Sequence, residues 1–394
     1  MTAAASSVVL LAGMAWASQP AGAAFSNGTA NATAVVSRVA PGVGSLALGI
    51  TGGVGVSEVK NSLAQSQAQA TDLGLIGTTL TAEGCDGSDA YITPDQLPGP
   101  TRVDNRAGDA EASDDEFPIA GEALGGGREE AWATTAPAAG ATATSAASFG
   151  PVAKLSGGRA DVVTEVVDDS ARQARATVEA SIDIAGVVDL SGLRWEAFHR
   201  TGSDPGATGS FDVGTARILG APVPIESLES LEGAVNTALA PSGITVTFPT
   251  VERIAEPTDL VRVTPMRIVL KDSPAGAATI GPGLGLTREQ RSEVFEQIAT
   301  RYCRAAGALL VGDITLSIAS GTGFLAIEVG GAEAQTADLV LENPFGSFTP
   351  APNEALPASG VPSIPGSATV RPTGVPAAGA PVEQVASQPV ADIG

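Results

Sequence analysis

The sequence has few residues of the types that most often carry chemistry. It contains one histidine, His199, two cysteines and three methionines, and aromatic residues make up 4% of its 394 residues. A single histidine excludes a zinc site built from several histidines, and Cys85 and Cys303 are too far apart for a Cys-x-x-Cys metal or redox motif. A Gly-x-Ser-x-Gly nucleophile elbow is also missing. These absences argue against the common histidine- and cysteine-dependent enzymes.

Basic residues are scarce as well. The chain has 21 Lys and Arg against 43 Asp and Glu, which gives a formal net charge of −22. Nucleic acids bind to basic surfaces, so we expect no nucleic-acid partner, and anionic membrane surfaces are disfavoured for the same reason. The apolar fraction of 43% is too high for a wholly disordered chain.

No stretch reaches the roughly 18 apolar residues of a membrane-spanning helix, so we expect no transmembrane helix. A short apolar run, Val8–Ala17, is followed by small residues at Ala21–Ala24, which is typical of a secretory signal peptide over residues 1–24. The usual basic residues before the run are missing, since the first is Arg38. The alternative is a buried helix of a cytoplasmic protein.

The C-terminal residues 344–394 contain 10 prolines and few charges. Such composition is typical of an extended chain that buries no core. We therefore expect a disordered Pro-rich tail.

Alternation of apolar and polar residues with period two, the pattern of half-buried strands, recurs along the chain. Residues 25–84 are expected to form an N-terminal β segment, and residues 129–343 the main domain. The clearest strands of the main domain are expected over 161–167, 172–184, 187–201 and 210–219. Turn residues separate them, which favours antiparallel meanders.

Two segments have the period of amphipathic helices. In residues 226–239 the leucines and valine at 228, 231, 235 and 239 share one face, and residues 287–305 begin with a capping-box pattern at Thr287–Gln290. Expected strands flank them at 244–248, 260–271, 309–317 and 323–329. The predicted class is thus α+β, mainly β, with antiparallel meander sheets and two helices.

Residues 85–128 form an acidic, turn-rich insert, which we interpret as a surface loop. Its carboxylates make a calcium site conceivable, and the weak candidates as ligands are Asp104, Asp109, Asp114 and Asp115. Their spacing does not match an EF-hand, because the third position counted from Asp104 is Arg106. A solvated acidic loop is the simpler interpretation, and we assign no metal site.

In an exported chain, two cysteines suggest one disulfide, between Cys85 and Cys303. The bond would close a loop of 218 positions and stabilise the fold by at most about 5 kcal/mol in the chain-entropy description. The alternative is two separate buried thiols.

No catalytic or cofactor-binding residue stands out. His199 alternates in phase with Leu193, Trp195 and Ala197, which favours a packed structural histidine over a catalytic base. The glycine run at 281–285 resembles a phosphate-binding loop, but Leu286 replaces the third glycine of that motif and Pro282 removes an amide. Carboxylate pairs are too numerous to single one out for glycoside hydrolysis.

Three segments, 191–202 (SGLRWEAFHRTG), 256–274 (EPTDLVRVTPMRIVLKDSP) and 309–334 (LLVGDITLSIASGTGFLAIEVGGAEA), resemble uncharacterised exported proteins of actinobacteria. The resemblance covers most of residues 25–345. It implies export and a GC-rich coding background, and such proteins often end in a C-terminal membrane anchor. It implies no activity.

These patterns lead to three hypotheses. The first is a secreted or cell-envelope-associated, non-enzymatic β-rich protein with a structural role or a binding role, whose unknown partner is a cell-wall component or a lipid, and which uses no cofactor. The second is an extracytoplasmic carrier of lipid or another apolar ligand, and the third is a secreted hydrolase that uses carboxylates.

Overall fold

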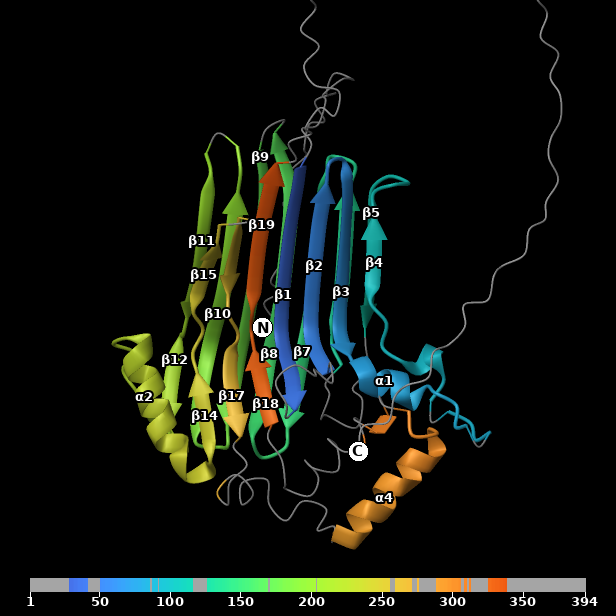
Figure 1. Ribbon diagram of the computed structural model, residues 1–394. Helices are drawn as coiled ribbons and strands as arrows, with labels where there is room; N and C mark the ends of the chain where they lie inside the picture. Colours follow the sequence, from blue (N-terminus) through green and yellow to red (C-terminus); the bar gives the residue numbers. More distant parts are fainter. Residues whose placement is uncertain are drawn as a thin grey trace, which may run out of the picture. The chain divides into compact units, whose positions relative to one another are not determined.

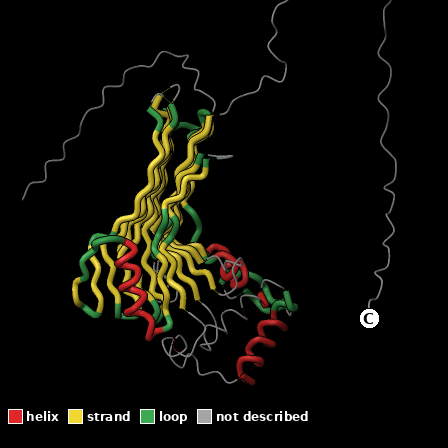
Figure 2. Tube along the Cα trace, turned by 60° about the vertical axis from the view of Figure 1, so that its left-hand side comes forward, coloured by secondary structure: helices red, strands yellow, loops and turns green. Residues whose placement is uncertain are grey.

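The computed structural model describes residues 28–41, 50–85, 87–90, 92–115, 126–168, 171–202, 204–255, 259–270, 275, 288–305, 308–309, 312 and 325–338. In this part the protein is mainly β, with two antiparallel sheets stacked as layers and few helices (Figures 1 and 2). The expected α+β, mainly β, class is confirmed. The expected signal peptide, residues 1–24, and the Pro-rich tail, residues 344–394, lie outside the described residues.

The first sheet, sheet A, combines strands from both ends of the described chain. Its N-terminal strands are β1 (Gly28–Pro41), β2 (Ile50–Lys60), β3 (Leu63–Asp72) and β4 (Thr101–Asp104). Its C-terminal strands are β14 (Ile244–Thr247), β15 (Val251–Ile254), β16 (Leu260–Val263), β17 (Met266–Leu270), β18 (Leu325–Val329) and β19 (Ala332–Asp338).

Strand β1 is the centre of sheet A. One side of it pairs with β2, while the other side pairs with β19 along Gly28–Ala34 and with β18 along Ser37–Pro41 (Figure 1). The division expected between residues 25–84 and the main domain at 129–343 therefore has no counterpart, because both segments supply neighbouring strands. The pattern analysis missed β1 and β19 because their inward positions are mostly alanine, which gives little hydrophobic contrast.

The second sheet, sheet B, is a meander in which consecutive strands from β5 to β10 pair in order. Its strands are β5 (Ala110–Asp115), β6 (Arg128–Thr134), β7 (Ala138–Phe149), β8 (Ala153–Asp168), β9 (Ala171–Ile184), β10 (Val188–Arg200), β11 (Gly206–Asp212), β12 (Thr215–Ile218) and β13 (Ala221–Pro222). The antiparallel meander expected between residues 161 and 219 is confirmed.

The inner faces of the two sheets bury small residues at one end of the strands. The buried alanines there include Ala30, Ala32, Ala34, Ala64, Ala68, Ala139, Ala141, Ala160, Ala174, Ala176, Ala332 and Ala334. The layers are close enough that the Ser57 hydroxyl of sheet A donates a 2.8 Å hydrogen bond to the Ala139 carbonyl of sheet B. Only small side chains fit between backbones at such a distance.

At the other end of the strands the core residues are large. They include Leu155, Ile182, Ile184, Leu190, Met266, Ile268 and Leu270, all fully buried. Figure 2 shows the strands of both layers changing direction part way along their length. The small-residue and large-residue parts of the core lie toward opposite ends of these strands.

Irregular backbone accompanies this bend in both sheets. In sheet A, Gly330–Gly331 separates β18 from β19, and Pro265 lies between β16 and β17. In sheet B, the register shifts at Gly192 in β10 and at Gly157–Gly158 in β8. Bulges of this kind bend a strand and increase its twist. The single strand expected over 260–271 is consequently two strands.

Trp195 of β10 lies against the irregular backbone at Gly330. Its ring is fully buried and packs 4.9 Å, centroid to centroid, from Phe211. A Cβ added at Gly330, whose φ is +75°, would come within 2.1 Å of this ring. Glycine is thus required at 330 both by the backbone conformation and by the close approach of the indole.

In the described part of the chain, the α-helices α1 (Gly74–Leu80), α2 (Leu228–Leu239) and α4 (Arg288–Arg301) lie outside the sheets. Helix α2 agrees with the predicted helix, begins at the cap Ser227 and buries Leu231, Val235 and Leu239 as its periodicity predicts. Helix α4 agrees with the second prediction, although Thr287 and the glycine run at 281–285 are outside the described residues. None of the described helices combines the length and apolarity needed to cross a membrane.

The bend allows a test of the fold. We expect Gly330→Ala to lower the free energy of unfolding by about 2–4 kcal/mol, because it adds both backbone strain and overpacking against Trp195. Urea unfolding of the purified protein measures the change. Gly220→Ala is the matched control, since Gly220 has a φ of +79° but open space around its Cβ position. Equal losses in the two variants would contradict the packing role of Trp195.

Candidate functional site

The acidic insert, expected to be a surface loop over residues 85–128, contains two strands. Strand β4 pairs with β3 in sheet A, and β5 pairs with β6 in sheet B, so the chain passes from one layer to the other between Asp104 and Ala110. The loop interpretation is corrected at these positions. Strand β5 has the sequence AEASDD, in which small and acidic residues alternate too weakly to predict a strand.

The four candidate metal ligands do not converge. The carboxylate of Asp104 accepts a 3.0 Å hydrogen bond from the backbone N–H of Arg106, while Asp114 and Asp115 lie on the exposed edge strand β5. Asp109 accepts hydrogen bonds from the backbone N–H and the hydroxyl of Thr135 at 2.6 and 2.8 Å, and these bonds hold its pKa below the ordinary value. Among the described residues, no three His, Cys, Asp or Glu side chains are grouped to hold a metal.

A buried carboxylate joins the two sheets next to β4. Glu129 of β6 is fully buried, and its two oxygens accept hydrogen bonds from the backbone N–H groups of Ala70, at 2.5 Å, and Thr101, at 2.8 Å. A buried carboxylate is tolerated when backbone donors satisfy it. Glu129 therefore fixes the start of β4 against sheet B.

Asn105 fixes the other end of β4. Its amide donates to the carbonyls of Ser62 and Thr134, both at 2.9 Å, and its side-chain oxygen accepts from the N–H of Ala64 at 3.1 Å. Thr134 belongs to sheet B and the other two partners to the β2–β3 turn and β3. Both ends of the short edge strand β4 are thus tied to neighbouring backbone.

On the outer face of sheet A, strands β2, β3 and β4 form a groove of about 480 Å³. Its lining residues are Val56, Glu58, Gln65, Ser66, Gln67, Arg102, Val103 and Asp104. The strand register arranges the outward side chains in two rows across the strands: Val56, Gln67 and Arg102 in one, and Glu58, Gln65 and Asp104 in the other. We call this site the β2–β3–β4 groove.

Neighbouring side chains orient one another within the β2–β3–β4 groove. The Gln65 amide donates to the Glu58 carboxylate at 2.5 Å, and the Arg102 Nε–H donates to the Gln67 side-chain oxygen at 2.8 Å. Asp104 lies 3.5 Å from the Arg106 guanidinium at the end of its row. Of these residues only Asp104 was a sequence candidate. The polar outward positions of β2 and β3 were a usable signal, but the pairing of the strands was needed to group them.

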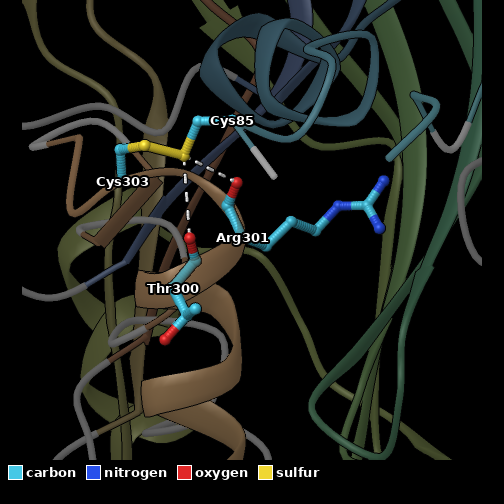
Figure 3. The surroundings of a disulfide bond; sticks show 4 residues. All are labelled: Cys85, Thr300, Arg301 and Cys303. Atoms are coloured by element: carbon cyan, nitrogen blue, oxygen red, sulfur yellow. Dashed lines mark hydrogen bonds between the residues drawn. A yellow bond between two sulfur atoms is a disulfide. The ribbon is translucent and has the colours of Figure 1, made fainter. Parts of the chain in front are cut away.

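The predicted Cys85–Cys303 disulfide is confirmed, with Cα atoms 6.0 Å apart. It joins the segment after α1 to the residues just beyond α4, and both cysteines are exposed (Figure 3). The backbone N–H of Cys85 also donates to the carbonyl of Arg301 at 2.9 Å. The bond therefore attaches α4 to a part of the chain 218 positions away.

His199 is packed as its alternation predicts: it is 2% exposed, on the inner face of β10. Its Nδ1 lies 2.7 Å from the hydroxyl of Thr336 in sheet A, and its Nε2 lies 3.1 Å from the carboxylate of Asp259. A carboxylate only accepts hydrogen bonds, so a proton on Nε2 faces Asp259, while the direction of the hydrogen bond between Nδ1 and the Thr336 hydroxyl depends on the tautomer. The order of groups, from the Thr336 hydroxyl through the His199 ring to the Asp259 carboxylate, resembles a catalytic triad in which the hydroxyl is the nucleophile. Thr336, however, is also 2% exposed, so we assign the cluster to holding the sheets together.

Asp259 has a second partner at the surface. The guanidinium of Arg253 donates two hydrogen bonds to it, at 3.0 and 3.1 Å. The hydrogen bond from Arg253, assisted by His199, keeps the pKa of Asp259 below its ordinary value of 3.8, although partial burial opposes the shift. This ion pair closes the cluster on the solvent side.

Comparisons of the chain with protein-family models, with curated proteins and with solved structures find no match.

The disulfide gives a second prediction. Reduction, or the Cys85→Ser/Cys303→Ser double variant, should lower the free energy of unfolding by up to about 5 kcal/mol, because the unfolded chain regains the freedom of a long loop. Urea unfolding with and without a thiol reductant measures the loss. In the double variant the reductant should cause no further change, and an undiminished stability after complete reduction would contradict the structural role of the bond.

The Asp259 carboxylate gives a third prediction. A lowered folded-state pKa means that ionised Asp259 stabilises the fold above pH 3.8, and that this contribution is lost as the pH falls through the folded-state pKa. Asp259→Asn should therefore be less stable than the wild type at neutral pH and equally stable in strong acid. Urea midpoints measured as a function of pH provide the comparison. A difference that persists unchanged in strong acid would show that Asp259 acts through packing instead of charge.

Proposed function

We propose that this protein is exported to the cell envelope or the medium and acts there as a non-enzymatic β-rich binding protein. The observation that carries the binding role is the β2–β3–β4 groove, in which polar side chains from three strands face one space and are held by one another. Concave sites with a few oriented polar groups are typical of ligand binding. The two ties on β4, from Glu129 and Asn105, keep one wall of the groove in place.

The disulfide supports the export part of the proposal. Cys85 and Cys303 are exposed, so a reducing compartment would have access to the bond. Disulfides of this kind persist in oxidising surroundings. The signal-like residues 1–24 and the resemblance of three segments to exported actinobacterial proteins favour the same compartment.

A small cavity between the sheets is a poor site for an apolar ligand. The cavity lined by Val39, Ile50 and Phe149, at the large-residue end of the sheets, holds only about 10 Å³. That is about the volume of one water-sized probe, and far less than a lipid chain needs. Of these two spaces, the outer groove is therefore the better candidate for a binding site.

Expression of the full chain in a GC-rich Gram-positive host tests the proposal. We expect the protein in the envelope or medium fractions, cleaved after residue 24, with Cys85 and Cys303 resistant to alkylation until a reductant is added. Mass spectrometry of peptides prepared without reductant reads out both features. An uncleaved cytoplasmic protein with alkylated thiols would refute export. Turnover of a glycoside or ester substrate that is lost in Glu58→Gln would show that the groove is catalytic.

A further inference from the structure

We propose that the β2–β3–β4 groove binds a neutral saccharide chain. This inference rests on the binding function proposed above and names the chemical class of its ligand. It draws on three properties of the groove: the hydrogen-bonding groups left open, the balance of charge and the fixed geometry of the side chains.

The open groups of the groove include both donors and acceptors. In the described part of the chain, the Gln67 amide nitrogen and the terminal nitrogens of Arg102 have no protein partner, and they belong to one row. The second oxygen of Glu58 and the side-chain oxygen of Gln65 are open in the other row. A hydroxyl group donates one hydrogen bond and accepts others, so a ligand with several adjacent hydroxyls can satisfy both rows.

The charges of the groove disfavour ionic ligands. Glu58 and Asp104 are matched by Arg102 and by Arg106, which pairs with Asp104, so the groove has little net charge of its own. The whole chain carries a net charge of −22, which repels an anion such as a phosphate or a uronate. A cation would find the two carboxylates separated by Gln65, with the guanidinium of Arg102 in the neighbouring row. Neither sign of charge matches the mixed rows, whereas an uncharged polyhydroxyl ligand does.

The geometry suits a flat, extended ligand. The six side chains project from three adjacent strands, whose spacing of about 4.8 Å places β2 and β4 about 10 Å apart across the sheet. Val56 adds an apolar contact for the C–H groups of a sugar ring. Hydrogen bonds within each row, together with the ties of Glu129 and Asn105 on β4, reduce the entropy lost on binding.

Titration of the full, disulfide-bonded protein with defined oligosaccharides tests the inference. The probes are the neutral hexasaccharides of β-1,4-linked glucose, β-1,4-linked N-acetylglucosamine and α-1,6-linked mannose, with hexagalacturonate as the anionic comparison. We expect at least one neutral probe to bind with a dissociation constant of about 1 mM or lower, measured by calorimetry. Glu58→Gln and Arg102→Met should each weaken that binding about tenfold or more, because each removes a charged hydrogen-bonding group.

The opposite sheet offers a matched control. Gln173 of β9 donates to Glu165 of β8 at 3.0 Å, an amide–carboxylate pair like Gln65 and Glu58 but outside the groove. Glu165→Gln should bind the probe as the wild type does. Three results would overturn the inference: no binding of any neutral probe, equal losses in Glu165→Gln and Glu58→Gln, or tighter binding of hexagalacturonate. The proposed export and binding role would survive any of these, since its own tests are localisation, thiol state and the absence of turnover.

Discussion

The close approach of two sheets across a layer of alanine is the constraint on which the rest of this fold depends. The hydroxyl of Ser57 reaches the backbone of Ala139 in the opposite sheet, so the side chains between the layers have to be small. Alanine buries little apolar area, and apolar burial contributes only about 25 cal/mol per Å². Many residues must therefore share the stabilisation, which is consistent with strands as long as the 16 residues of β8. Buried polar groups placed between the sheets, such as Glu129 and the His199–Thr336 pair, then fix the register that uniform alanine surfaces leave poorly specified.

The bend shows how the same two sheets change from a thin core to a thick one. Trp195 needs more room than an alanine layer gives, and Gly330 gives it that room by having no side chain. Beyond this point the inner faces carry leucine, isoleucine and methionine, and α2 adds Leu231 and Leu239 to the core. The glycines and Pro265 at the bend thus do more than end strands. They separate the part of each sheet that packs through alanine from the part that packs through large side chains. A regular, unbent strand keeps one distance to the opposite sheet and so fits only one of these two kinds of core.

The elements that could be predicted from the sequence are those with strong local contrast. Strands β8 to β10 alternate clearly, and α2 has both a cap at Ser227 and a leucine stripe, so their residues alone indicate their structure. Strand β1 has no such contrast, and its central position follows from pairing with β18 and β19 nearly 300 residues later, which no local pattern contains. The disulfide could be inferred because only one pairing of two cysteines exists. The β2–β3–β4 groove could not be inferred from the sequence, because Glu58, Gln65 and Arg102 become neighbours only through the pairing of β2, β3 and β4.

The close approach of the two sheets also explains why the candidate site is on an outer face. With the interior filled mainly by apolar side chains, most long polar side chains lie outside the sheets, and the few that are buried, such as Glu129, are held by hydrogen bonds. At most edges a short strand such as β4 would be a weak point, open to pairing with another chain. Here Glu129 and Asn105 hold both of its ends, so Arg102 and Asp104 project from a backbone that cannot easily shift. The buried carboxylate that stabilises the edge is therefore also what makes an ordered polar groove possible there, and the stability of the fold and the geometry of the site depend on the same residue.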